Sequence, residues 1–138
     1  MTTIQVTPEQ VLTMMAELQE QSEVFHATGG LHNAAISDGA QFYIHRQDIG
    51  RHNALDKLYG YCIERHIIVR DKTLIFSGRI SSEILIKAAK IGVGMIISKS
   101  APTTLAVQLA EDLNITAIGF VRDGHFNIYS HPERVQNL

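Results

Sequence analysis

The chain has 138 residues, of which 45% are hydrophobic and 19% are charged, and its formal net charge is −2 at pH 7. This size and composition predict a folded domain with a buried core and exclude an intrinsically disordered chain. The small negative charge does not favour general binding of nucleic acids or membranes, which would need a basic excess. We therefore expect one domain over residues 1–138, with no nucleic-acid or membrane partner.

The sequence contains a single cysteine, Cys62. One cysteine cannot form an intrachain disulfide, a four-cysteine zinc site or a Cys-x-x-Cys redox site. Cys62 shares the apolar side of a predicted helix with Leu55 and Leu58, which indicates a core thiol rather than a nucleophile. The first residues do not resemble a signal peptide and no apolar stretch is long enough to span a bilayer, so we expect a cytoplasmic protein.

The first part of the chain predicts a helix followed by a β-hairpin. Residues 7–10, Thr-Pro-Glu-Gln, are typical of a helix start with a capping box. Apolar residues continue at helical spacing and fade near residues 21–25. Strands are predicted at residues 32–37 and 40–46, because the Asp38-Gly39 pair between them is a hairpin signal.

The rest of the chain alternates between helices and strands. This alternation predicts parallel strands covered by helices, and the hairpin adds antiparallel strands at one side. We therefore predict an α/β fold with a three-layer mixed β-sheet flanked by helices. The expected strands are residues 73–77, 93–98, 115–121 and 126–129, and the expected helices begin after Gly50, at Ser81 or Ser82, and at Ser100, the last two ending at Gly92 and near Leu113.

Four polar segments follow predicted strand ends, where parallel α/β sheets bind their ligands. Two of them combine a cation, hydroxyl groups and a helix N-terminus, a combination that suits phosphate oxygens. The alternative is that the hydroxyls only cap helices and that Arg79 is an ordinary surface charge. The four segments are residues 48–57, 77–83, 98–104 and 120–124.

His52 is the main candidate for acid–base chemistry, because it lies near a helix start, where a neutral imidazole is favoured. With Asp48 or Asp56 to orient it, His52 would be a general acid or base. The alternative is a capping or packing role. Although the sequence has seven histidines, it has no HExxH motif and no cysteine pair, so we expect no zinc site.

Five polar blocks occur in a fixed order over most of the chain: TGGLHNAA at 28–35, DIGRHNALDK at 48–57, SGRISSE at 77–83, SAPTTLA at 100–106 and GFVR at 119–122. In these blocks the chain resembles the C-terminal portion of the formate dehydrogenase accessory proteins, the FdhD family. The resemblance implies a cytidine deaminase-like fold. It also implies a sulfurtransferase that accepts sulfur from a cysteine desulfurase and delivers it to the molybdenum cofactor of formate dehydrogenase.

The cofactor implied by the resemblance is bis-molybdopterin guanine dinucleotide, of which guanosine diphosphate is a fragment mimic. The family's persulfide-bearing Cys-x-x-Cys pair has no counterpart in this sequence, and neither has its N-terminal half. We therefore expect the cofactor-binding part of the family; the alternative is a non-catalytic, partner-binding or homodimeric scaffold. The resemblance and the polar segments together indicate as cofactor-binding residues Arg51, His52, Asn53, Ser77, Gly78, Arg79, Ser81, Lys99, Ser100, Phe120, Arg122 and Gly124.

Overall fold

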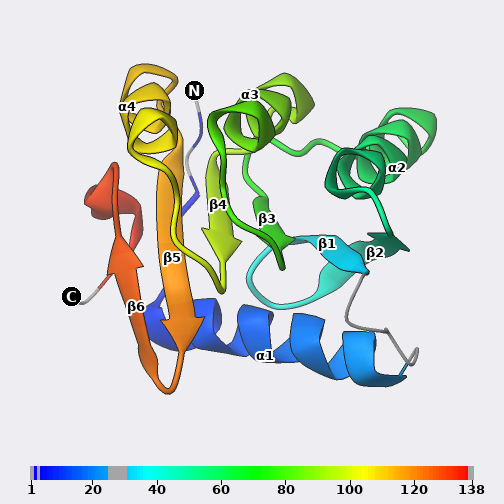
Figure 1. Cartoon of the computed structure of the whole chain (residues 1–138), viewed down its shortest axis with the longest axis horizontal. Coiled ribbons are helices and arrows are strands. Elements are labelled where there is room, and N and C mark those ends of the chain that lie inside the picture. Colours follow the sequence, from blue (N-terminus) through cyan, green and yellow to red (C-terminus); the bar gives the residue numbers. More distant parts are fainter. Residues whose placement is uncertain (1, 3, 25–30, 137–138) are drawn as a thin grey trace.

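The structure, a computed structural model, describes residues 2, 4–24 and 31–136. In this part of the chain six strands form one sheet in the order β2-β1-β3-β4-β5-β6 (Figure 1). The central strands β3, β4 and β5 are parallel, whereas β1 is antiparallel to both its neighbours and β6 is antiparallel to β5. The strands are β1 (His32–Ser37), β2 (Phe42–Asp48), β3 (Thr73–Phe76), β4 (Met95–Ser98), β5 (Thr116–Arg122) and β6 (His125–Ile128).

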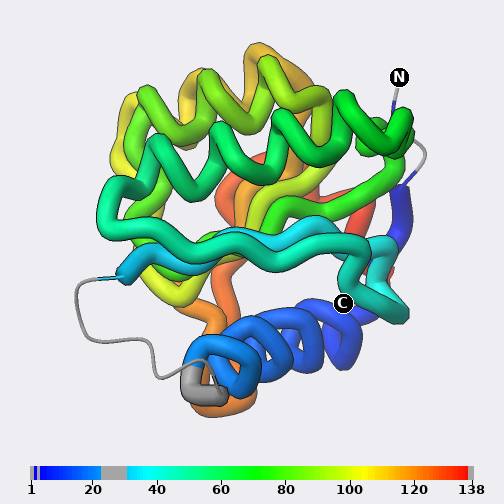
Figure 2. The backbone as a smooth tube through the Cα atoms, turned by 90° about the vertical axis from the view of Figure 1, so that its right-hand side faces the viewer, coloured from blue at the N-terminus to red at the C-terminus, as the bar shows by residue number. Residues whose placement is uncertain are grey.

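Helices cover both faces of this sheet, so the molecule has three layers (Figures 1 and 2). Helix α1 lies alone on one face, and α2, α3 and α4 lie side by side on the other. The predicted α/β fold with a three-layer mixed sheet is confirmed. The helices are α1 (Pro8–Val24), α2 (Arg51–Glu64), α3 (Ser82–Ile91), α4 (Thr104–Asp112) and the short 3-10 helix η1 (Pro132–Arg134).

Helix α1 begins with the predicted capping box. The Thr7 amide donates to Gln10 Oε1 at 2.8 Å, and the Gln10 amide donates to Thr7 Oγ1 at 3.2 Å. Its buried side chains, which include Met15 and Leu18, belong to the same apolar cluster as Ile97 of β4. Burying a side chain of this size contributes roughly 1.5–3 kcal/mol, so this packing stabilises α1 more than its propensity does.

The opposite apolar cluster joins α2, α3 and α4 to the other face of the sheet. Leu55, Leu58 and Cys62 belong to it, and Cys62 is only 4% exposed. Burial raises the pKa of the Cys62 thiol, which disfavours the thiolate that nucleophilic chemistry would need. The prediction that Cys62 is a core residue is confirmed.

Three predicted element starts are wrong by two residues or more, those of β2, β4 and α4. Strand β4 begins at Met95 rather than residue 93. In β2 and α4, local hydrogen bonds favour the later start. Strand β2 begins at Phe42 rather than residue 40, because the Asp38 carboxylate accepts the amides of Ala40 and Gln41 and holds them in a turn. Helix α4 begins at Thr104 rather than Ser100.

The later start of α4 is fixed by Thr103, whose hydroxyl accepts the Ala106 amide at 3.1 Å. Pro102 instead forms a parallel bridge with Ile80, and a residue before proline is disfavoured in helical conformation. The predicted ends of α3 are confirmed: Ser81 caps its start, and Gly92, with φ of +101°, ends it.

Within the described residues, no helix is both long and apolar enough to cross a membrane.

Candidate functional site

The topology brings all four predicted polar segments to one edge of the sheet. The parallel strands β3, β4 and β5 all end at this edge, and Phe76 at the end of β3 is in register with Ser98 at the end of β4. Because β1 is antiparallel to β3, its first residues lie at the same edge, and His32 is in register with Asp48 at the end of β2. The expected ligand crevice at the strand ends therefore exists as a geometric feature.

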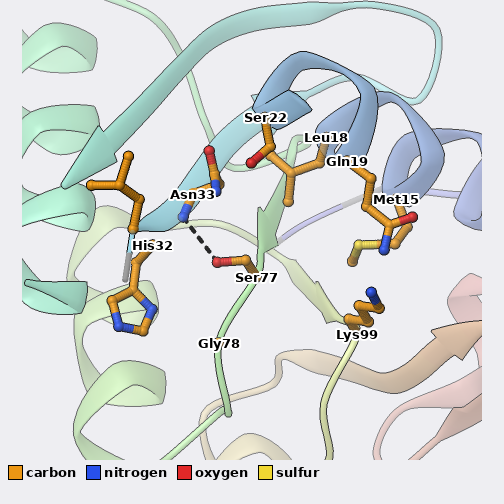
Figure 3. A pocket seen from close by; sticks show the side chains of 10 residues that line it. Met15, Leu18, Gln19, Ser22, His32, Asn33, Ser77, Gly78 and Lys99 are labelled. Carbon is orange, nitrogen blue, oxygen red and sulfur yellow. Dashed lines mark hydrogen bonds between the residues drawn. The ribbon is translucent and has the colours of Figure 1, made fainter. Parts of the chain in front are cut away.

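A pocket of about 490 Å³ lies between helix α1 and this edge (Figure 3). We call it the α1 pocket. Helix α1 supplies one wall, and the strand ends supply the other. Figure 3 shows Lys99 extending from its loop toward the α1 wall. The pocket is lined by Met15, Leu18, Gln19, Ser22, Leu31, His32, Asn33, Ser77, Gly78 and Lys99.

A second pocket, of about 360 Å³, adjoins the first and shares Lys99 with it. We call it the cation pocket, because three of its lining residues are basic. A smaller pocket of about 250 Å³ shares Arg122 with the cation pocket and Met15 and Gln19 with the α1 pocket. The three hollows are thus neighbours along the strand ends, and we call them together the crevice. The cation pocket is lined by Arg79, Lys99, Ser100, Ala101, Phe120 and Arg122.

The charges of the cation pocket are not neutralised by the protein. Among the described residues, Arg79, Lys99 and Arg122 form no ion pair with a carboxylate. The Arg122 guanidinium instead lies over the Phe120 ring, 4.9 Å from its centroid. Three basic side chains without carboxylate partners around one hollow favour an anionic ligand.

Phe120 occupies a backbone conformation that a bulky side chain rarely adopts. Its φ is +55°, in the left-handed region, and the pairing of β5 with β6 shifts register between Gly119 and Arg122. Such a conformation costs on the order of 1–3 kcal/mol and is found preferentially at functional sites. The irregularity lies in the strand segment that supplies both Phe120 and Arg122 to the cation pocket.

Asn33 anchors the strand edge beside the α1 pocket. Its amide donates to Ser77 Oγ at 2.9 Å, as drawn in Figure 3, and its carbonyl accepts the Ser77 amide at 3.0 Å. Its side-chain oxygen accepts from Gln47 Nε2 at 2.7 Å and lies 3.0 Å from His45 Nε2. Burial lowers the pKa of His45, which favours a neutral imidazole in this network.

The segment 48–57 is stabilised by contacts within itself. Lys57 Nζ lies 2.7 Å from Asp48 Oδ2, and the Gly50 amide donates to Asp48 Oδ1 at 2.9 Å. The hydrogen bond from Lys57, followed by that from the Gly50 amide, lowers the pKa of Asp48. Asn53 Nδ2 is 3.5 Å from the same carboxylate, at the limit of a hydrogen bond.

The expected pairing of His52 with Asp48 or Asp56 is not what the structure contains. His52 Nε2 lies 3.5 Å from Glu83 of α3, and Asp56 pairs with Lys87 at 2.6 Å. Both aspartates are thus bound to lysines, and this geometry does not orient His52 as a catalytic base. The sequence could not show this, because Glu83 and Lys87 come from another helix.

The predicted cofactor-binding residues fall into two groups. Arg51, His52, Asn53 and Ser81 do not line the three described pockets of the crevice. Ser81 accepts the Ile84 amide as a helix cap. The remaining eight line the crevice: Ser77, Gly78, Arg79, Lys99, Ser100, Phe120, Arg122 and Gly124.

Sequence reasoning missed the α1 wall of the crevice. Helix α1 was interpreted only as a core helix, although Gln19 and Ser22 are polar residues that line the α1 pocket. Asn33 was missed as well; it lies in the block 28–35, and the structure shows that it is a buried polar residue of β1. In the described ranges, no group of three or more His, Cys, Asp or Glu residues is arranged to hold a metal ion.

Comparison with known proteins identifies the family. The model of the FdhD/NarQ family matches residues 1–136. The chain belongs to the FdhD/NarQ family. It is 74% identical over 135 residues to the sulfur carrier protein FdhD of Staphylococcus aureus strain MRSA252, and 75% identical to that of strain Newman. Each alignment covers 98% of this chain and 51% of the relative, so the chain spans about half the length of these relatives.

Solved structures show that the fold of this FdhD/NarQ chain is shared more widely. A Desulfotalea psychrophila protein described as a formate dehydrogenase accessory protein superposes with a TM-score of 0.88 at 24% identity, covering 98% of this chain and 58% of that one. A Thermotoga maritima diaminohydroxyphosphoribosylaminopyrimidine deaminase/reductase gives a TM-score of 0.58 at 15% identity, over 83% of this chain and 37% of that one. The predicted deaminase-like fold is confirmed.

Proposed function

We propose that this chain binds bis-molybdopterin guanine dinucleotide, the molybdenum cofactor, during the sulfuration of formate dehydrogenase. The observation that carries the proposal is the cation pocket, in which Arg79, Lys99 and Arg122 surround one hollow without a carboxylate partner in the described part of the chain. The dinucleotide carries pyrophosphate groups, and arginine and lysine are the side chains that bind phosphate best. Membership of a family whose relatives are sulfur carrier proteins supports the same function.

The two larger pockets suit different parts of such a ligand. The cation pocket would hold phosphate oxygens, whereas the α1 pocket offers apolar contacts from Met15 and Leu18 together with polar groups from Gln19 and Asn33. A heterocyclic ring needs this mixture of apolar surface and a few directed polar groups. Lys99 lines both pockets. A ligand with its ring in the α1 pocket and its phosphates in the cation pocket would therefore contact Lys99.

The sulfur would come from a cysteine outside this sequence. Cys62 is the single cysteine, it is buried, and its thiol pKa is raised by burial, so it is unsuited to carry a persulfide. We propose that a cysteine desulfurase supplies sulfur to a separate thiol, and that this chain presents the cofactor to it. A formate dehydrogenase would then receive the sulfurated cofactor.

Titration calorimetry with guanosine diphosphate tests the proposal with a fragment of the ligand. We expect binding to the wild-type chain and an affinity roughly ten- to a hundredfold lower for Arg79→Ala, because a hydrogen bond to a charged group contributes roughly 1.5–3 kcal/mol. Arg51→Ala is the matched control, since Arg51 is also an exposed arginine at a strand-to-helix junction but lies outside the crevice pockets. Absence of binding at millimolar nucleotide, or equal losses in both variants, would contradict the assignment.

The open edge of β2 favours a second candidate, a homodimeric scaffold. Strand β2 is at one end of the sheet in the described part of the chain and pairs only with β1. Its residue Tyr43 is partly exposed there. An unpaired strand edge can pair with a second copy. Size-exclusion chromatography with light scattering checks this, and a monomer at the highest attainable concentration would remove the support.

A further inference from the structure

Two loops of the cation pocket are joined by the hydroxyl group of Ser98. This hydroxyl donates to the Gly78 carbonyl of the β3–α3 loop and accepts the Ser100 amide of the β4–α4 loop at 3.0 Å. Ser98 is 0% exposed, so water does not compete for these bonds. One buried side chain therefore uses both its donor and its acceptor to hold two site loops together.

Other connections between these loops are made by the backbone. Ile80 and Pro102 form a parallel bridge, and the Thr103 amide donates to the Ile80 carbonyl at 3.0 Å. These bonds lie at the helix side of the loops, after both charged residues. On the strand side, the side chain that links the two loops is Ser98. Its substitution therefore leaves the backbone bridge in place and removes one defined link.

The bonded atoms lie directly beside the two cations. The Gly78 carbonyl is in the peptide group that precedes Arg79, and Lys99 stands between Ser98 and the amide of Ser100. The backbone here is also closely packed, because a Cβ added to Gly78 would lie 3.0 Å from the Phe76 ring. The Gly78 peptide is thus positioned both by packing against the Phe76 ring and by the hydrogen bond from the Ser98 hydroxyl.

We propose that Ser98 is a positioning residue, which holds Arg79 and Lys99 at a fixed spacing for binding of phosphate groups in the cation pocket. The inference rests on the proposed function of that pocket. Ser98 itself would not contact the ligand. Its hydroxyl orders the two loops before the ligand binds. Less conformational entropy is therefore lost on binding, and the affinity is higher.

The chain provides a matched control in Ser130. This serine is also buried, at 2% exposure, and its hydroxyl likewise joins a carbonyl and an amide: it donates to Ile115 at 2.7 Å and accepts from Ala117 at 2.8 Å. These partners lie where β5 begins, at the opposite edge of the sheet from the crevice. Ser130→Ala should thus destabilise the fold without affecting the pocket.

The experiment compares Ser98→Ala, Ser98→Thr and Ser130→Ala by calorimetry with guanosine diphosphate and by amide hydrogen exchange without ligand. We expect Ser98→Ala to bind about five- to tenfold more weakly, the effect of losing about 1–1.4 kcal/mol of hydrogen bonding. Ser98→Thr keeps the hydroxyl and should restore most of the affinity. Ser130→Ala should bind within about twofold of wild type, since a hydrogen bond lost outside the site affects stability rather than affinity. Circular dichroism confirms folding, and Ser98→Cys, with a weak donor of similar size, replaces a Ser98 variant that does not fold.

Hydrogen exchange separates this inference from the proposed function. In Ser98→Ala the amides of residues 78–80 and 99–101 should exchange faster than in wild type and in Ser130→Ala. If wild type fails to bind the nucleotide, the proposed function fails, and the proposed effect of Ser98 on affinity fails with it. If wild type binds but Ser98→Ala matches it in affinity or in exchange of these two loops, Ser98 is not a positioning residue although the proposed function stands.

Discussion

The segment 48–57 and the cation pocket are both rich in polar residues and lie along the same sheet edge, yet their charges are used differently. In the first, Asp48 pairs with Lys57 and Asp56 pairs with Lys87. In the second, Arg79, Lys99 and Arg122 have no carboxylate partner among the described residues. The first segment stabilises a strand-to-helix junction, whereas the cation pocket keeps an excess of positive charge around a hollow.

This difference shows that the number of polar residues is a poor guide to a binding site. Segment 48–57 has more charged side chains than any of the other three polar segments. What distinguishes the cation pocket is an excess of one sign of charge beside a hollow. A carboxylate at each strand end would have neutralised it.

Charge reversal of one lysine in each region should give the largest contrast. Lys99→Glu places a carboxylate in the lining of the cation pocket and should weaken binding of guanosine diphosphate by about a hundredfold or more, because an attraction becomes a repulsion. Lys57→Glu breaks the ion pair with Asp48 but should change affinity by less than about twofold. Calorimetry at low salt measures both. Similar losses in the two variants would mean that the regions act as one site.

Phe120, the residue of the cation pocket with a positive φ, gives a second contrast, in the free energy of unfolding. Because Phe120 has φ of +55°, Phe120→Gly should be more stable than Phe120→Ala, by roughly 0.5–1 kcal/mol. At an ordinary strand position an alanine variant is more stable than a glycine variant. Phe126 lies within β6 and does not have a positive φ, so Phe126→Ala should be more stable than Phe126→Gly. Urea denaturation of the four variants provides the values. Both Phe120 variants should also bind the nucleotide more weakly, since Arg122 loses its contact with the ring.

A smaller effect distinguishes Thr103, which caps helix α4, from Ser100, where the sequence predicts that the helix starts. Thr103→Ala should lower the free energy of unfolding by about 1 kcal/mol, the typical contribution of a capping side chain. Ser100→Ala should be close to neutral in stability, because Ser100 bonds through its backbone amide and carbonyl. Denaturant titration of both variants is the measurement. If Ser100→Ala were the more costly change, the helix would begin where the sequence alone suggests.

Helices α3 and α4 also show which helix ends can be predicted from the sequence. The ends of α3 were predictable, because the Ser81 cap and the Gly92 stop are decided by bonds within a few residues. The start of α4 was not, because Pro102 is held by Ile80, which follows a different strand. Local signals predicted the layers and the strand order at the hairpin, but not a helix start set by a neighbouring loop.

The candidate site was likewise predictable only where its residues are placed by local signals or by the topology of the sheet. Eight of the twelve predicted residues line the crevice, since strand ends of a parallel sheet converge by topology. The α1 wall was not predictable, because nothing in the sequence of α1 states which edge of the sheet its C-terminal half will approach. His52 was misplaced for a similar reason: its partner Glu83 belongs to α3.

The smallest expected effect concerns the pH dependence of stability that arises from Asp48 in segment 48–57. The hydrogen bonds from Lys57 and the Gly50 amide lower the pKa of Asp48 below its ordinary value of 3.8. A carboxylate with a lowered pKa stabilises the fold above that value and loses this contribution as the pH falls through the folded-state pKa. Wild type should therefore lose stability below about pH 3.8 more steeply than Asp48→Asn, and the two unfolding curves should converge in acid.

Urea denaturation at a series of acidic pH values tests this, with Asp112→Asn on α4, an exposed carboxylate, as the reference variant. The effect should be modest because the Asp48 side chain is still partly exposed, at 21%, and near the surface ion pairs are weak and salt screens them. At neutral pH, Asp48→Asn should bind guanosine diphosphate as wild type does, since the carboxylate acts on its own segment and not on the crevice. A loss of affinity in this variant, with stability unchanged, would mean that segment 48–57 takes part in ligand binding rather than in stabilising its own junction.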